Sequence, residues 1–205
     1  MANVAPAKFK TAKEERVSQE SATFNMPVIG ALAEQWGRIN ANISEIVRQT
    51  AQDDLDLPVP PRGWPIWAVV AHTMAGRVYW LCGVLKQPGA ELTPFDEETV
   101  TEGLGWEDHL DIPRSRDDLI RAIDSTWQVV AGWLQRWSPD MLKETYPREG
   151  QSGTQWHTNP SIFTRLLNHE GYEMGQVAMT LGTRGREVID IWRDVVGKAP
   201  TSAKS

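Results

Sequence analysis

The sequence contains very little cysteine and no concentrated positive charge. Cys82 is the single cysteine in 205 residues, which excludes an internal disulfide framework and fits a reducing compartment. The formal net charge is −6, and no cluster of lysine and arginine stands out. Since a nucleic-acid-binding protein needs a basic patch that neutralises phosphates, we expect no nucleic-acid partner.

Long apolar runs are also missing. The longest uncharged apolar stretch, GWPIWAVVAHTMAG, contains His72 and is followed by Arg77, so it does not read as a membrane span. Residues 1–24 lack the apolar core of a secretory signal. These absences predict a cytoplasmic protein with no membrane partner.

Apolar residues are nevertheless abundant between the two ends of the chain. Hydrophobic residues make up 40% of the sequence, and ten of them are tryptophans, which favours a well-packed core or an aromatic-lined cavity. Residues 1–24 and 198–205 are polar and lack periodicity, so we predict a flexible N-terminal arm and a flexible tail. Residues 25–197 are predicted to form one domain.

Four segments have the apolar spacing of amphipathic helices. Residues 27–51 and 115–137 place apolar side chains at alternating intervals of three and four, which is one face of a packed helix. Residues 64–86 and 160–182 show the same period. Residues 186–196 could add a short fifth helix.

A long connection, residues 88–114, separates the second and third predicted helices. A loop of this length in a compact domain is often functional, or is a crossover between helices. At its end, Ser115 followed by Asp118 is a suitable helix start. Because no strand series is apparent, the sequence predicts an all-α fold: a four-helix bundle with a long connection between helices 2 and 3.

The fourth predicted helix carries polar residues within its apolar stripe. Ile162 and Leu166 are followed on the same face by His169, Glu173, Gln176 and Thr180. An unpaired buried charge is costly, so these residues should pair with one another or bind something. His169 and Glu173 are separated by about 6 Å along the helix axis, a spacing at which two donors can hold one metal ion.

A metal ion at this position needs a third ligand from another helix. Two of the four histidines, His109 and His157, lie in connecting segments. His72 lies midway along the second helix, and Gly76 one turn later leaves space beside it. The predicted ligands are therefore His72, His169 and Glu173, a set of three with an open position, as in catalytic zinc sites.

Two further residues are candidates for supporting a ligand or contacting a substrate. Gln176 follows Glu173 on the same helical face, and Tyr79 lies two turns after His72, where its hydroxyl could reach a cavity. Arg77 and Glu170 lie beside the predicted stripes, and we expect both to be exposed to solvent.

The same residues also have a purely structural interpretation. His169 and Glu173 could form an ion pair within one helix, and His72 could be a hydrogen-bonded core histidine. Buried polar groups can also fix the register of packed helices. The alternative function is therefore a non-catalytic binding or dimerisation module without metal.

The order of these motifs resembles one known family. HEGYEMGQV followed by MTLGTRG is similar to the fourth-helix signature of the DinB-like (DinB/YfiT-like) superfamily of metalloenzymes. WAVVAHTMAGRVYWLCGVL resembles the family's second helix, and STWQVVAGWLQRWSPDML resembles its third, so that the resemblance covers roughly residues 27–192. It implies a four-helix bundle, a zinc or nickel ion held by three histidines, and a homodimer.

One ligand position departs from the family pattern. His72 and His169 match, whereas Glu173 stands where the family has its second fourth-helix histidine. A carboxylate also binds zinc, and two histidines with one glutamate are an established catalytic set. The resemblance further implies a metal-dependent thiol S-transferase or hydrolase that acts on a small molecule, with a low-molecular-weight thiol as partner.

Overall fold

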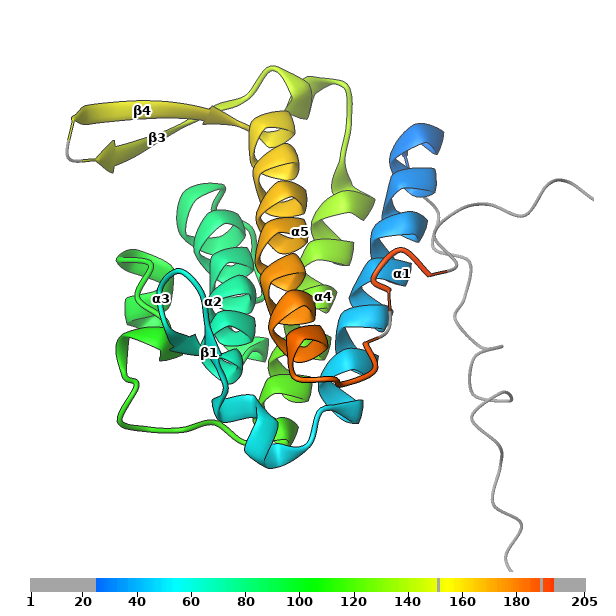
Figure 1. Ribbon diagram of the computed structural model, residues 1–205. Helices are drawn as coiled ribbons and strands as arrows, with labels where there is room; N and C mark the ends of the chain where they lie inside the picture. Colours follow the sequence, from blue (N-terminus) through cyan, green and yellow to red (C-terminus); the bar gives the residue numbers. More distant parts are fainter. Residues whose placement is uncertain (1–24, 151, 189, 194–205) are drawn as a thin grey trace, which may run out of the picture.

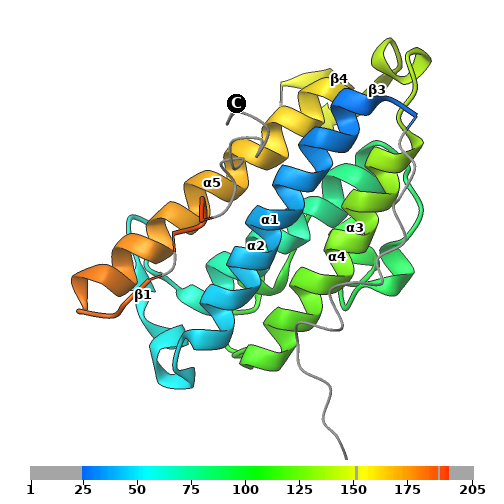
Figure 2. The ribbon, with the colours of Figure 1, turned by 90° about the vertical axis from the view of Figure 1, so that its right-hand side faces the viewer.

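The protein is mostly helical in a computed structural model that describes residues 25–150, 152–188 and 190–193 (Figure 1). Helix α2 packs against both α4 and α5, and α1 packs against α4 (Figure 2). The helical fold that the apolar periodicity predicts is confirmed. The four long helices are α1 (Pro27–Gln49), α2 (Ile66–Val78), α4 (Arg116–Arg136) and α5 (Asn159–Thr183).

Helices α4 and α5 begin where the sequence predicts. The Ser115 hydroxyl accepts a hydrogen bond of 3.2 Å from the backbone N of Asp118, and the Asp118 carboxylate accepts one of 3.2 Å from the backbone N of Ser115. This reciprocal pair satisfies two donors at the helix start that would otherwise lack partners. Thr158 caps α5 in the same manner, with Pro160 in the first turn.

The long connection is a structured layer on α2. It contains η4 (Ala90–Leu92), α3 (Glu97–Thr101) and η5 (Trp106–Asp108), and both α3 and η5 contact α2. Helix α2 itself continues into a π-helical segment, η3 (Tyr79–Val84). Gly83 in this segment is required, because a Cβ there would lie 2.1 Å from the Val100 carbonyl oxygen. The connection therefore brings residues from the middle of the chain against the centre of the fold.

Two small antiparallel hairpins correct the all-α prediction, which contains no strands. Strands β1 (Pro58–Val59) and β2 (Trp64–Pro65) follow the short η2 (Gln52–Asp56). Strands β3 (Thr145–Gly150) and β4 (Gly153–Thr158) follow η6 (Asp140–Leu142), and their hairpin projects beyond the start of α5 (Figure 1). Neither longer strand has a buried apolar face, so the alternation that identifies a strand in a sequence is absent.

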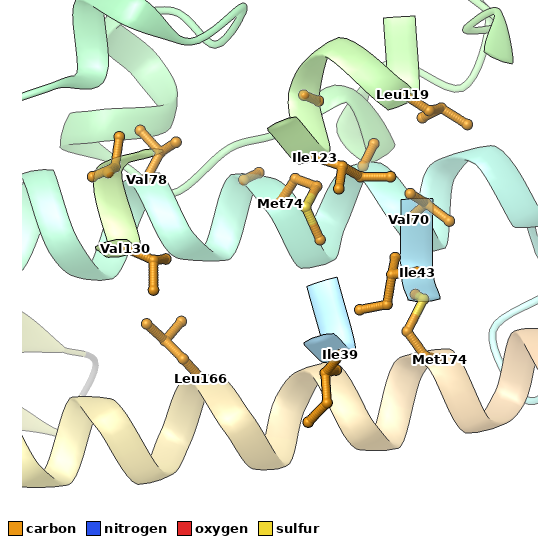
Figure 3. Packing of buried hydrophobic residues seen from close by; sticks show 14 of the residues in the cluster. Ile39, Ile43, Val70, Met74, Val78, Leu119, Ile123, Val130, Leu166 and Met174 are labelled. Carbon is orange, nitrogen blue, oxygen red and sulfur yellow. The ribbon is translucent and has the colours of Figure 1, made fainter. Parts of the chain in front are cut away.

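The hydrophobic core lies between the four long helices (Figure 3). Its centre combines Ile43 of α1, Met74 of α2, Ile123 of α4 and Leu166 of α5, which are all buried. The largest fully buried side chains include Trp36, Trp67 and Trp133, so much of the unusual tryptophan content is core packing. Among the residues that the structure describes, no helix has both the length and the apolarity that crossing a membrane requires.

A buried ionic network shows that the prediction of exposed Arg77 and Glu170 is wrong. The Arg77 side chain is 0% exposed and that of Glu170 is 2% exposed. Arg77 Nε donates to Glu170 Oε1 at 2.7 Å, and Trp36 Nε1 donates to Glu170 Oε2 at 2.8 Å. Arg77 Nη1 also donates to Asn40 Oδ1 at 2.8 Å. The network links α1, α2 and α5.

Several predicted segments fall partly or wholly outside the described residues. The predicted arm, 1–24, and the predicted tail, 198–205, lie outside them, as does the end of the predicted 25–197 domain. Within the predicted fifth helix, 186–196, the described residues are not helical.

Candidate metal centre

The three predicted ligand side chains converge between α2 and α5. The Nε2 atoms of His72 and His169 are 3.1 Å apart, and His169 Nε2 is 3.6 Å from Glu173 Oε1. One donor atom from each residue lies within 4.8 Å of the other two. Gly76 lies next to the His169 ring, and a Cβ at that position would be in van der Waals contact with the ring at 3.5 Å.

The spacing and chemistry of these donors fit a divalent ion. Nitrogen and oxygen ligands around a tetrahedral zinc ion are separated by about 3.3 Å, close to the two shorter separations found here. The Glu173 side chain is 1% exposed, and its Oε2 atom has no hydrogen-bond partner among the described residues. A buried carboxylate oxygen without a partner is costly, and a bound cation would remove that cost.

Glu107 is a supporting residue that the sequence did not reveal. Its Oε1 atom lies 2.5 Å from His72 Nδ1, and its side chain is 4% exposed. A carboxylate that accepts the Nδ1 proton orients the imidazole and leaves Nε2 with its lone pair toward the cleft, an arrangement found around metal-bound histidines. Glu107 comes from η5 in the long connection, and only the length of that connection hinted at a functional role.

Arg62 is the second residue that sequence reasoning missed. It lies in the turn between β1 and β2, and its Nη1 atom donates to Glu173 Oε1 at 3.0 Å. Its guanidinium also lies over the Trp64 ring, 4.7 Å from the centroid, and that ring packs edge-on against His72. Arg62 thus balances the charge of the buried Glu173 carboxylate and binds its Oε1 atom, while Glu173 Oε2 has no hydrogen-bond partner among the described residues.

The environment favours neutral imidazole at His169. Burial, followed by the nearby His72, lowers the pKa of His169 below its ordinary value of 6.5. A histidine whose charged form is disfavoured keeps a nitrogen lone pair at neutral pH, and neutral imidazole is the form that binds a metal ion.

Both imidazoles line an open cleft of about 610 Å³. Tyr79 forms part of its wall, as the sequence suggests, but its hydroxyl accepts a hydrogen bond of 2.6 Å from Arg148 Nε. Gln176 does not line the cleft; it is partly exposed, and its amide has no hydrogen-bond partner among the described residues. His157 joins the cleft wall, whereas His109 is exposed elsewhere.

Cys82 is a buried thiol outside this cleft. Burial and the nearby Glu91 raise its pKa to about 11. At pH 8 the native protein is therefore expected to react with a chromogenic disulfide reagent about 100-fold more slowly than an ordinary thiol, because it contains so little thiolate. Timed labelling with and without denaturant checks this expectation. Rapid labelling of one thiol per chain in the native state would contradict it.

Comparison with known proteins places this arrangement in context. The family model described as the DinB superfamily matches residues 35–177, a stretch that includes all three candidate ligands. A crystal structure described as a DinB-like protein from Bacillus cereus shares the fold, with a TM-score of 0.58 at 15% identity, over 78% of this chain and 95% of that chain. No curated protein matches the chain.

Proposed function

Because this chain belongs to the DinB superfamily, whose members generally bind metals, we propose that His72, His169 and Glu173 bind a divalent ion, zinc or nickel. The observation that carries the proposal is the convergence of three donors, one of which has a buried oxygen without a partner. The four long helices, as a bundle, hold these donors on two rigid neighbours, α2 and α5.

The chemistry follows from the donors and the cleft. When bound, the ion would supply Lewis acidity, which lowers the pKa of a water or thiol ligand. Glu107 holds the proton on His72 Nδ1, and Arg62 holds the Glu173 carboxylate in place. The cleft admits a small molecule to the imidazole side of the centre. We propose a metal-dependent thiol S-transferase or hydrolase that acts on a small molecule, with a low-molecular-weight thiol as co-substrate.

One observation favours the alternative of a non-catalytic binding or dimerisation module without metal. The Arg62–Glu173 ion pair, the His72–His169 contact and the His72–Glu107 contact already provide partners for most polar atoms of the cluster. In this alternative, the polar residues set how α2 and α5 pack against each other.

Metal content separates the two proposals. Elemental analysis of the full chain, purified without an affinity tag or chelator, is expected to give about one zinc or nickel per chain. The His169→Ala variant is expected to contain none while remaining helical by circular dichroism, because two ligands alone hold a metal far less tightly.

Two matched variants make this test specific. His109→Ala removes an exposed histidine and is expected to retain the metal. Glu173→His restores the residue of the family pattern and is expected to preserve or tighten binding. Absence of metal from the wild-type chain, with none taken up on addition of zinc or nickel, would support the module without metal.

A further inference from the structure

Two arginines at the cleft have no acidic partner in the described part of the chain: Arg165 lines the cleft, and Arg148 packs on the cleft-lining Tyr79 and Trp80. Among the residues that the structure describes, no carboxylate lies within the 4.0 Å ion-pair distance of Arg148 or Arg165. Of the residues that line the cleft, Glu107 alone carries a carboxylate, and that group is bonded to His72. The positive charge at this end of the cleft is therefore not neutralised within the described part of the chain.

Both arginines are held around one indole ring. The Cζ atom of Arg165 lies 4.4 Å from the centroid of Trp80, and that of Arg148 lies 5.2 Å from the same centroid. Arg148 is further fixed by neutral groups, since its Nε donates to the Tyr79 hydroxyl at 2.6 Å and its Nη1 to Gln155 Oε1 at 3.4 Å. Both guanidinium groups therefore pack on a side chain that lines the cleft, and an anion bound beside them would offset their positive charge.

The local field is positive although the whole chain has a net charge of −6. His157 also lines the cleft, edge-on to Trp80 at 5.0 Å. Burial, followed by the charges of Arg165 and Arg148, lowers the pKa of His157. A cleft with this field concentrates small anions relative to neutral molecules.

We infer that Arg148 and Arg165 form a binding subsite for the anionic oxygen group, carboxylate or phosphate, of a small molecule that occupies the cleft. Guanidinium groups suit this role, because their planar donors match both oxygens of a carboxylate or phosphate. Trp80 and Tyr79 line the cleft beneath the two guanidinium groups, and His72 and His169 line the same cleft. The substrate class is therefore a small organic acid or phosphate ester. This assignment rests on the proposed function, which concerns the other part of the same molecule, the part that faces His72 and His169.

The subsite is tested in metal-free, full-length protein, so that no bound cation contributes to anion binding. Benzoate, phenyl phosphate and the neutral benzamide are titrated separately, and the indole signal of Trp80, assigned with Trp80→Phe, is followed by NMR. Either anion is expected to give a saturable shift that benzamide does not give. Arg148→Gln and Arg165→Gln are each expected to weaken anion binding about 10-fold or more.

A matched variant and a second readout complete the test. Arg48→Gln removes an exposed arginine of α1 and is expected to leave anion binding unchanged. Equal binding in wild type and both subsite variants, benzamide binding as tight as benzoate, or no binding of either anion would overturn the subsite. Metal content is measured on the same proteins. If the wild-type chain contains metal but its metal-free form does not bind either anion, only this inference is overturned. If the wild-type chain binds the anions but takes up no metal, only the metal assignment is overturned.

Discussion

Replacing Arg77 with methionine is expected to lower the free energy of unfolding by about 3–5 kcal/mol. The substitution leaves Glu170 as an uncompensated charge in a core where both side chains are almost completely buried. It also removes a donor to Asn40. Denaturant unfolding followed by circular dichroism measures the change, which should lower the midpoint without altering the helical signal of the native state.

Two variants show whether the isolated charge causes this loss. Arg77→Met combined with Glu170→Gln should recover a large part of the stability, because glutamine is neutral and still offers an oxygen to Trp36 Nε1. Arg48→Met on the surface of α1 should change stability by less than about 0.5 kcal/mol. A single Arg77→Met variant as stable as wild type would show that the buried pair does not contribute as the structure indicates.

Replacing Glu107 with glutamine is expected to weaken metal binding about 10- to 100-fold. Glutamine retains the shape and an acceptor for His72 Nδ1, but it removes the negative charge that the imidazole contacts at 2.5 Å. The His72 imidazole then becomes a weaker electron-pair donor to the metal ion, and its ring is oriented less firmly. Competition with a chromophoric chelator at fixed pH measures the affinity of zinc and nickel for wild type and variant.

Glu98→Gln is the matched control for this experiment, because Glu98 is an exposed glutamate of α3 in the same connection. It should bind metal as tightly as wild type. If Glu107→Gln also binds metal with wild-type affinity, Glu107 is a structural partner of His72 and does not tune the centre.

Much of the helical scaffold could be predicted because its information is local. Apolar side chains at intervals of three and four mark a buried helix face without reference to other helices. The cap formed by Ser115 and Asp118 likewise depends on only four consecutive residues. His169 and Glu173 share a helix, so their proximity follows from helix geometry alone. His72 is predicted as the third ligand because His109 and His157 lie in connecting segments, and because His72 matches a ligand position in the family resemblance.

The residues that were missed all depend on contacts between distant segments. Arg77 and Glu170 are 93 residues apart. A charged residue considered alone is expected on the surface, because its burial requires a partner of opposite charge. On α5, the buried positions include Ile162, Leu166, Glu170, Met174 and Val177, a stripe slightly rotated from the predicted one. The β3–β4 hairpin was missed because its strands bury no apolar face, although the sequence GQSG at residues 150–153 is typical of a turn.

The sequence by itself determined the helical class, the position of the main helices and a pair of donors one turn apart, because each of these depends on residues close together in the chain. Tertiary structure decided which distant groups complete the centre. Glu107 and Arg62 reach it from the connections between the long helices, whose conformation is set by what they pack against rather than by any repeating pattern. The charge around the cleft was decided in the same way, since Arg148 and Arg165 become one positive subsite only when a hairpin and a helix meet over Trp80.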